Sequence, residues 1–232
     1  MLAACTTTTS TKVGSVPIKP IPEQQDRTTI NQLGKSDFDR MADVEMRENT
    51  DSLRLLMRKL YKRNPQELHK STSDPAEKMV DWVFDGAAQH HFQFEAINNL
   101  QDTDAIFLAF RSDYQGDRVL PFIVGIHTML LKAHGNKIDF YLTDNLDPQR
   151  IYNVARNVEI AAWKLSNARA PNGALYLLTN EVNDKDRNLS FEREFGKIIG
   201  RTDLYAIALA EKSQRFISRV MQNLATAFFL PF

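Results

Sequence analysis

The chain has 232 residues, of which 43% are hydrophobic and 25% are charged, which is enough for one domain of about 190 residues with its own core or for two smaller ones. Lys plus Arg and Asp plus Glu each number 29, so the net charge is zero and no basic excess points to nucleic acid as a partner. No stretch reaches the roughly 20 apolar residues that a membrane-spanning helix needs.

The single cysteine of the chain ends the tetrapeptide Leu2-Ala3-Ala4-Cys5. This tetrapeptide resembles the lipobox of bacterial lipoproteins, in which the bond before the cysteine is cut and the cysteine then carries lipid on its sulfur and its amine. The resemblance covers these four residues only, and it implies lipidation of Cys5 and anchoring to a membrane. Lipoproteins kept at the inner membrane commonly have Asp after the cysteine. Thr6 in that position therefore implies the outer membrane, facing the periplasm.

A lipoprotein signal also has a basic and an apolar segment before its lipobox, and here only Met1 precedes Leu2. We therefore interpret residues 1–5 as the remnant of a longer signal that starts upstream, with Cys5 as the lipidation site. The alternative is a cytosolic helical protein that starts at Met1 and carries an incidental thiol.

Residues 6–35 predict a disordered, flexible linker. Threonine and serine fill positions 6–11, and Pro17, Pro20 and Pro22 follow. Few large apolar side chains occur, so the segment cannot bury enough surface to offset the entropy of ordering it. A flexible coil of this length spans roughly 30 Å on average, which would let a lipid-anchored domain stand away from the membrane.

Helix signals dominate residues 36–232, and we predict a mainly α-helical, bundle-like domain there. Gly86 and Gly200 are expected to separate neighbouring helices. The predicted helices cover residues 37–63, 75–85, 102–110, 118–134, 147–165, 190–199 and 202–228. Residues 137–143 alternate apolar and polar side chains as a half-buried strand does, and residues 174–179 are a candidate partner. A small β-hairpin inserted in the helical domain is therefore predicted.

Four histidines and one glutamate are the candidates for a metal site. His91 and Glu95 are four residues apart, and His127 and His134 are seven apart, so each pair shares one helical face; His90 adjoins the first pair. The spacing matches neither His-Glu-x-x-His nor the Glu-x-x-His pairs of di-iron bundles, and ordinary packed histidines explain it equally well. No metal is therefore assigned. A helical metal-binding protein or enzyme that uses this cluster remains an alternative.

The sequence contains no Gly-x-Ser-x-Gly elbow, and the segment from Gly196 to Gly200 lacks the spacing of a phosphate-binding loop. We therefore expect no catalytic residue and no cofactor, and a non-enzymatic role is favoured. The lipobox resemblance and the linker together predict a membrane-anchored periplasmic lipoprotein whose helical domain is a binding or assembly component of the cell envelope. Its expected partners are the membrane and other envelope proteins.

The last residues of the chain include Phe228, Phe229, Leu230 and Phe232. Burying one such side chain contributes about 1.5 to 3 kcal/mol, so we expect the segment to dock on its own domain. The alternative is an exposed patch of Phe228, Phe229 and Phe232 that binds a partner protein or a membrane surface.

Overall fold

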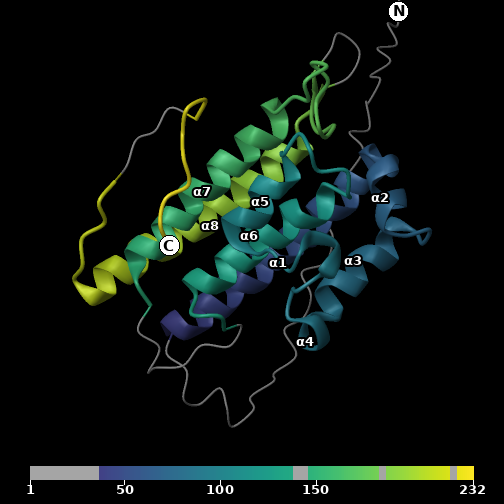
Figure 1. Cartoon of the computed structure of the whole chain (residues 1–232). Coiled ribbons are helices and arrows are strands. Elements are labelled where there is room, and N and C mark those ends of the chain that lie inside the picture. The colour runs from purple at the N-terminus through teal and green to yellow at the C-terminus, as the bar shows by residue number, and fades with distance from the viewer. Residues whose placement is uncertain (1–36, 138–145, 183–186, 220–223) are drawn as a thin grey trace, which may run out of the picture. The chain divides into compact units, whose positions relative to one another are not determined.

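The structure is a computed structural model that describes residues 37–137, 146–182, 187–219 and 224–232. The chain divides after residue 33, and every described residue belongs to the second unit, residues 34–232. Helices dominate this unit, which confirms the predicted mainly α-helical, multi-helix domain (Figure 1). The helices are α1 (Asp37–Arg63), α2 (Pro65–Ser71), α3 (Ala76–Asp85), α4 (Ala87–His90), α5 (Asp102–Ala109), α6 (Val119–Ala133), α7 (Pro148–Asn167) and α8 (Ser190–Ser213), with a 3₁₀ turn, η2 (Glu95–Ile97).

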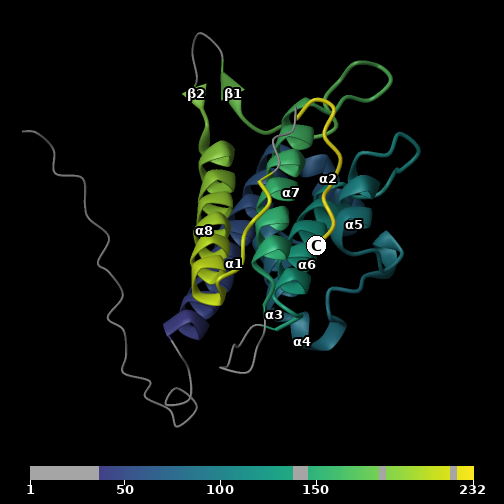
Figure 2. The same ribbon diagram turned by 90° about the vertical axis from the view of Figure 1, so that its left-hand side faces the viewer.

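Four long helices form the centre of the domain. α6 packs against α1 and α7, and α8 packs against the same two helices, so the four close a ring of contacts. α5 covers α6, and α3 lies on α1. Figure 2 shows α8, α1, α7 and α6 standing side by side. The core therefore lies between helices that come from both halves of the chain.

α6 is the most buried of these helices, because almost all of its side chains are apolar and are enclosed by α1, α5 and α7. The close approach of α5 depends on Gly125. A Cβ atom at this position would lie 2.6 Å from the Asp102 carbonyl oxygen and 2.9 Å from the Ile106 amide nitrogen. The missing side chain therefore lets the backbone of α5 rest directly on α6.

The start of α7 is where the sequence predicts it. Asp147 is the N-cap, its carboxylate accepts a hydrogen bond from the Gln149 amide at 3.0 Å, and Pro148 is the first helical residue. A proline costs nothing at this position, because the first amide of a helix has no partner within the helix. The capping residue and the proline beside it thus explain why α7 begins at this point of the sequence.

The prediction of two helices at residues 190–199 and 202–228 is wrong. A single helix, α8, runs through Gly200 and ends at Ser213. Glycine weakens a helix by only about 1 kcal/mol, and the burial of Phe195, Ile198 and Tyr205 around it outweighs that cost. The helix ends where Gln214 takes a left-handed backbone conformation (φ 53°) and its amide bonds back to the carbonyls of Ala210 and Glu211.

The structure also places the β-hairpin differently from the prediction. Residues 138–145, most of the first predicted strand, lie outside the described residues. Residues 174–179 form no regular strand, and Leu175 makes one isolated antiparallel bridge with Arg169. The described strands are β1 (Glu181–Val182) and β2 (Arg187–Asn188), which pair antiparallel. The alternation that predicted the first strand therefore stays a prediction, and the candidate partner at residues 174–179 is wrong.

The last residues of the chain return to α7. Asn157 holds Leu230 by both ends of its amide: its Oδ1 accepts from the Leu230 amide at 2.6 Å, and its Nδ2 donates to the Leu230 carbonyl at 2.8 Å. Asn153, one turn earlier, donates to the Pro231 carbonyl at 2.7 Å. The side chain of Leu230 is buried by this arrangement. Two asparagines on one helical face thus act as backbone partners for an extended segment.

Candidate functional site

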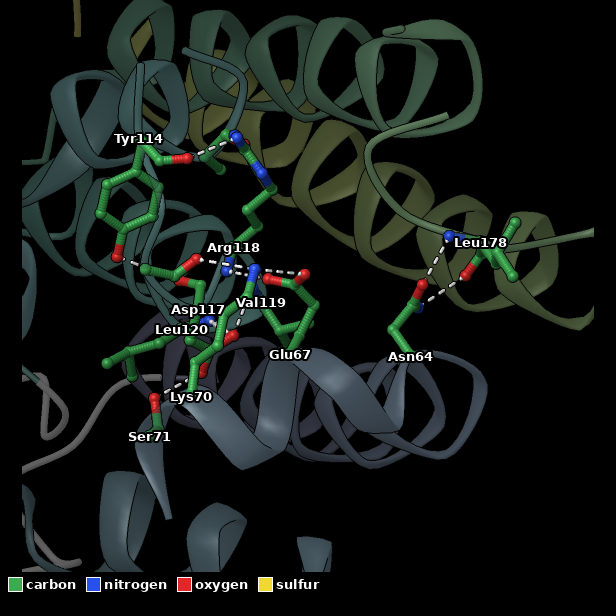
Figure 3. A network of polar contacts seen from close by, with 12 residues as sticks. Asn64, Glu67, Lys70, Ser71, Tyr114, Asp117, Arg118, Val119, Leu120 and Leu178 are labelled. Carbon is green, nitrogen blue, oxygen red and sulfur yellow. Dashed lines mark hydrogen bonds and ion pairs between the residues drawn. The ribbon is translucent and has the colours of Figure 1, made fainter. Parts of the chain in front are cut away.

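Two buried carboxylates lie at the N-terminal end of α6 (Figure 3). Asp117 caps the helix, because its Oδ1 accepts hydrogen bonds from the amides of Val119 at 2.8 Å and Leu120 at 3.4 Å. Its Oδ2 accepts from the Tyr61 hydroxyl at 2.6 Å and the Ser71 hydroxyl at 2.9 Å. Asp117 therefore ties the ends of α1 and α2 to the start of α6.

Glu67 of α2 is the second carboxylate. Its Oε2 accepts from the Arg118 amide at 2.8 Å, and its Oε1 lies 2.7 Å from the Lys70 ammonium. The partial positive charge at a helix N-terminus stabilises both acids. The Arg118 guanidinium donates to backbone carbonyls of residues 109, 111 and 114 and stacks 4.3 Å from the Tyr176 ring centre. This end of α6 is therefore a fully bonded polar junction inside an apolar domain.

Burial changes the ionisation of the groups at this junction. It raises the pKa of Asp117 to about 6, although its hydrogen bonds each favour the charged form. It also raises the pKa of Tyr114 to about 12, and the pKa of Tyr61 well above its usual value, so both phenols stay protonated. Asp117 is consequently the group here whose charge changes in the mildly acidic range.

A hollow of about 810 Å³ opens beside Asp117. Its volume is in the range of small-molecule sites. Apolar side chains from α3 and α6, including Met79, Leu120 and the half-exposed Trp82, face polar groups of α2 and of the loop before α6. The polar lining consists of Lys70, Ser71, Thr72, Asp74, Lys78, Asp81, Tyr114 and Asp117. The hollow thus combines apolar contact area with hydrogen-bonding and charged groups, and this combination suits an amphipathic ligand or a partner side chain.

The histidines proposed from the sequence occupy three different environments. His90 donates from Nε2 to the Trp82 carbonyl of α3 (3.2 Å) and accepts at Nδ1 from the Phe92 amide in the turn after α4 (3.0 Å), so both of its nitrogens have partners. His91 and Glu95 are exposed on that turn and on η2. His127 and His134 are buried at two levels of α6. No three acidic, cysteine or histidine side chains of the described residues come together in a way that could hold a metal ion.

His134 belongs to a buried polar cluster at the C-terminal end of α6. Its Nε2 lies 2.7 Å from Glu45 Oε2, and its Nδ1 bonds the Leu130 carbonyl at 2.9 Å. Glu45 Oε1 also accepts from Asn49 at 2.5 Å and from Thr202 at 2.8 Å. α1, α6 and α8 are therefore linked through one carboxylate, which the sequence analysis did not single out.

The three phenylalanines at the chain end differ in their surroundings. Phe229 packs edge-to-face on Phe107, with ring centres 5.0 Å apart, and Phe232 lies 5.1 Å from the Lys132 ammonium. Phe228 is 71% exposed. Cys5, the proposed lipidation site, lies outside the described residues. None of the described helices is long and apolar enough to cross a membrane.

Comparison of the chain with family models, with curated proteins and with solved structures finds no match. The polar junction at Asp117 was not predicted from the sequence. The one feature that could have indicated it is the position of Asp117 relative to the helix that follows. Asp117 stands two residues before the apolar helix α6, and a short polar side chain near a helix start can accept from the amides of the first turn. Similarly, Glu45 and Asn49 interrupt the apolar face of α1, and Asn153 and Asn157 interrupt that of α7. Polar residues in such positions indicate buried partners but do not name them.

Proposed function

We propose that the protein is a lipid-anchored binding or assembly component of a bacterial cell envelope. The observation that supports binding is the hollow beside Asp117, where apolar side chains of α3 and α6 face ionisable groups. The tetrapeptide that ends at Cys5 supports lipidation. On this proposal the acyl chains supply the anchor, since each buried methylene contributes about 0.8 kcal/mol, and the helical domain meets its partner in the periplasm.

Metabolic labelling of the native gene product with a clickable palmitate tests the anchor. The wild type and Thr6→Ala should carry the label, and Cys5→Ala should lose it, because the lipid is attached to the Cys5 sulfur. The Thr6→Ala variant controls for a general effect of changing this region. Label on Cys5→Ala, or no label on any of the three, would contradict the proposal and favour a cytosolic helical protein.

A photoreactive residue placed in living cells tests the binding role of the hollow. At Trp82, which lines the hollow and is 50% exposed, it should give a discrete adduct with an envelope component. The matched control is Leu204 on α8, which is 60% exposed and lies outside the hollow. Equal adducts from both positions, or none from Trp82, would rule out the hollow as the place of contact.

A further inference from the structure

His127 lies in the middle of α6 and is 4% exposed. Its Nε2 is 3.2 Å from Thr50 Oγ1. The Thr50 hydroxyl already donates its one hydrogen to the Met46 carbonyl, at 2.8 Å, so toward His127 it can only accept. Nε2 therefore carries the hydrogen, and Nδ1 is the nitrogen with the lone pair.

The lone pair of His127 Nδ1 meets no hydrogen-bond partner among the described residues, although the atom is buried. Buried polar atoms are nearly always bonded, so an exception calls for an explanation. Burial lowers the pKa of His127 to about 3, and the imidazole is therefore neutral near pH 7. The nitrogen is thus an acceptor that attracts a hydrogen-bond donor and has no positive charge to offer an anion.

His127 lines a second hollow, of about 640 Å³, between α1, α3 and α6. Its inner wall is mainly apolar and aromatic: Met46, Thr50, Phe84, Ala87 and Phe92 surround the imidazole. Charged residues of α1 and α3 complete the lining, and Arg54 and Asp85 among them pair with each other at 2.5 Å. The volume of this hollow is in the range of small-molecule sites.

The turn after α4 holds an aromatic ring over His127. The Phe92 ring centre lies 4.4 Å from that of His127, and Phe84 approaches the imidazole edge-on at 5.3 Å. Both His91 (φ 50°) and Phe92 (φ 56°) have left-handed backbone conformations, which are unfavourable for residues with a side chain. The Gln101 amide fixes them by donating to both of their carbonyls. Such conformations persist where the surroundings impose them, often at ligand sites.

We propose that the hollow over His127 is a binding site for a small aromatic molecule that carries one hydroxyl or N–H donor. The donor bonds to His127 Nδ1, and the ring packs between Phe84 and Phe92 and displaces the latter from the imidazole. Phe92 is 7% exposed and packs with the core, so the turn that carries it, between α4 and η2, has to move for the ligand to reach the nitrogen. This site is separate from the hollow beside Asp117 and does not depend on its function.

Binding of 2-naphthol to the full chain, compared with 2-methoxynaphthalene, tests the proposal. The two probes share the ring system, and the ether lacks the donor. Titration followed by NMR of ¹⁵N-labelled histidine should show the His127 Nδ1 resonance move upfield with naphthol, as it does when the lone pair accepts a hydrogen bond. The ether should bind about tenfold more weakly, which is the size of one hydrogen bond.

His127→Leu should reduce the affinity for naphthol to that for the ether, whereas His69→Leu, an exposed histidine of α2, should leave it unchanged. The spectrum of the wild type needs no variant, so the test holds even if His127→Leu fails to fold. Equal affinity for the two probes, no binding of either, or a His127 Nδ1 resonance that naphthol leaves in place would overturn the proposal. A resonance already in the hydrogen-bonded position and unmoved by naphthol would assign the site to a bound water and equally overturn it.

Discussion

His127 lies within α6 and His134 directly follows its last residue, two turns later; both are buried, and yet their pKa values move in opposite directions. At His127 burial lowers the pKa to about 3. Burial also disfavours the charged form of His134, but the negative charge of Glu45, a hydrogen bond with it and the Leu130 carbonyl reverse the effect and raise the pKa. Burial alone therefore does not decide whether a core histidine is neutral.

The difference comes from α1. Glu45 faces His134, and Thr50 faces His127, in the reversed order expected of two antiparallel helices. Where the carboxylate of Glu45 faces the ring, the pKa of the imidazole rises, and where only the Thr50 hydroxyl faces it, burial lowers the pKa. The partner helix therefore sets the direction in which the pKa of each histidine moves.

The largest expected effect is that of Glu45→Ala, which removes the charged partner of His134 and an acceptor for Asn49 and Thr202. Breaking a buried pair typically costs about 3 to 5 kcal/mol. Urea unfolding at pH 6 should show a loss of that order. The control is Glu48→Ala, because Glu48 is half-exposed and pairs with Arg47 on the surface; it should change the free energy of unfolding by less than about 0.5 kcal/mol.

Acidification should act through His127. Between pH 6.5 and about 3 the unfolded chain binds a proton at this imidazole and the folded chain does not, so the free energy of unfolding falls as the pH falls. The loss attributable to this group is about 5 kcal/mol across the whole window and about 3 kcal/mol between pH 6.5 and 4. In His127→Leu, the free energy of unfolding measured at pH 6.5 and at pH 4 should differ by less than in the wild type, because the contribution of this imidazole is gone. A variant with the wild-type slope would show that His127 is protonated in the folded state.

Glu45→Gln removes the negative charge of residue 45 and keeps its shape. This change should lower the pKa of His134, as burial does at His127. In Glu45→Gln, desolvation is no longer opposed by a carboxylate, and the pKa of His134 should fall. NMR titration of the imidazole ¹H–¹³C signals measures this directly. In the wild type the contribution of His134 to stability is present below pH 6.5 and is lost as the pH rises through its raised pKa. In Glu45→Gln that loss should disappear, and a His134 titration that stays unchanged would refute the role of Glu45.

The smallest effect is expected from Thr50→Val, which keeps the shape of the side chain and removes the acceptor for His127 Nε2. A buried donor left without a partner costs about 1 to 3 kcal/mol, and we expect the lower end because the donor is uncharged. Thr50→Ser, which keeps the hydroxyl, should lose less. Thermal unfolding of the two variants side by side separates the hydrogen bond from the lost methyl group. Equal losses would mean that the contact is packing only.

What could be predicted from the sequence was local. The apolar run of α6 and the Asp147-Pro148 start of α7 each depend on neighbouring residues, and both are found in the structure. The end of α8 was missed because apolar spacing continues past Gln214, although Phe216 in that stretch is 99% exposed. Helical periodicity reports which side chains could share a face and not whether another element is there to cover them.

The polar sites could not be predicted, because their members are far apart in the chain. Asn49 and Thr202 meet across 153 positions, and Tyr61 and Asp117 across 56. The prediction that His91 and Glu95 share one helical face is wrong for a local reason, since α4 ends at His90 and Glu95 begins the separate 3₁₀ turn η2. The sequence named His127 only as a candidate metal ligand, and its hydrogen-bond partner, Thr50, belongs to a helix about which the spacing of histidines says nothing.

The position of α1 has a mechanical consequence. This helix carries the chain onward from residue 36 and packs directly against α2, α3, α6 and α8. A force applied to the segment before α1 would therefore act first on α1, the helix that contacts most of the other helices. Tension would reach the buried Glu45 and Asn49 before any peripheral helix, so the domain should resist force until it yields as a whole. Optical-tweezer extension from the N-terminal side should accordingly show one abrupt rupture instead of stepwise peeling.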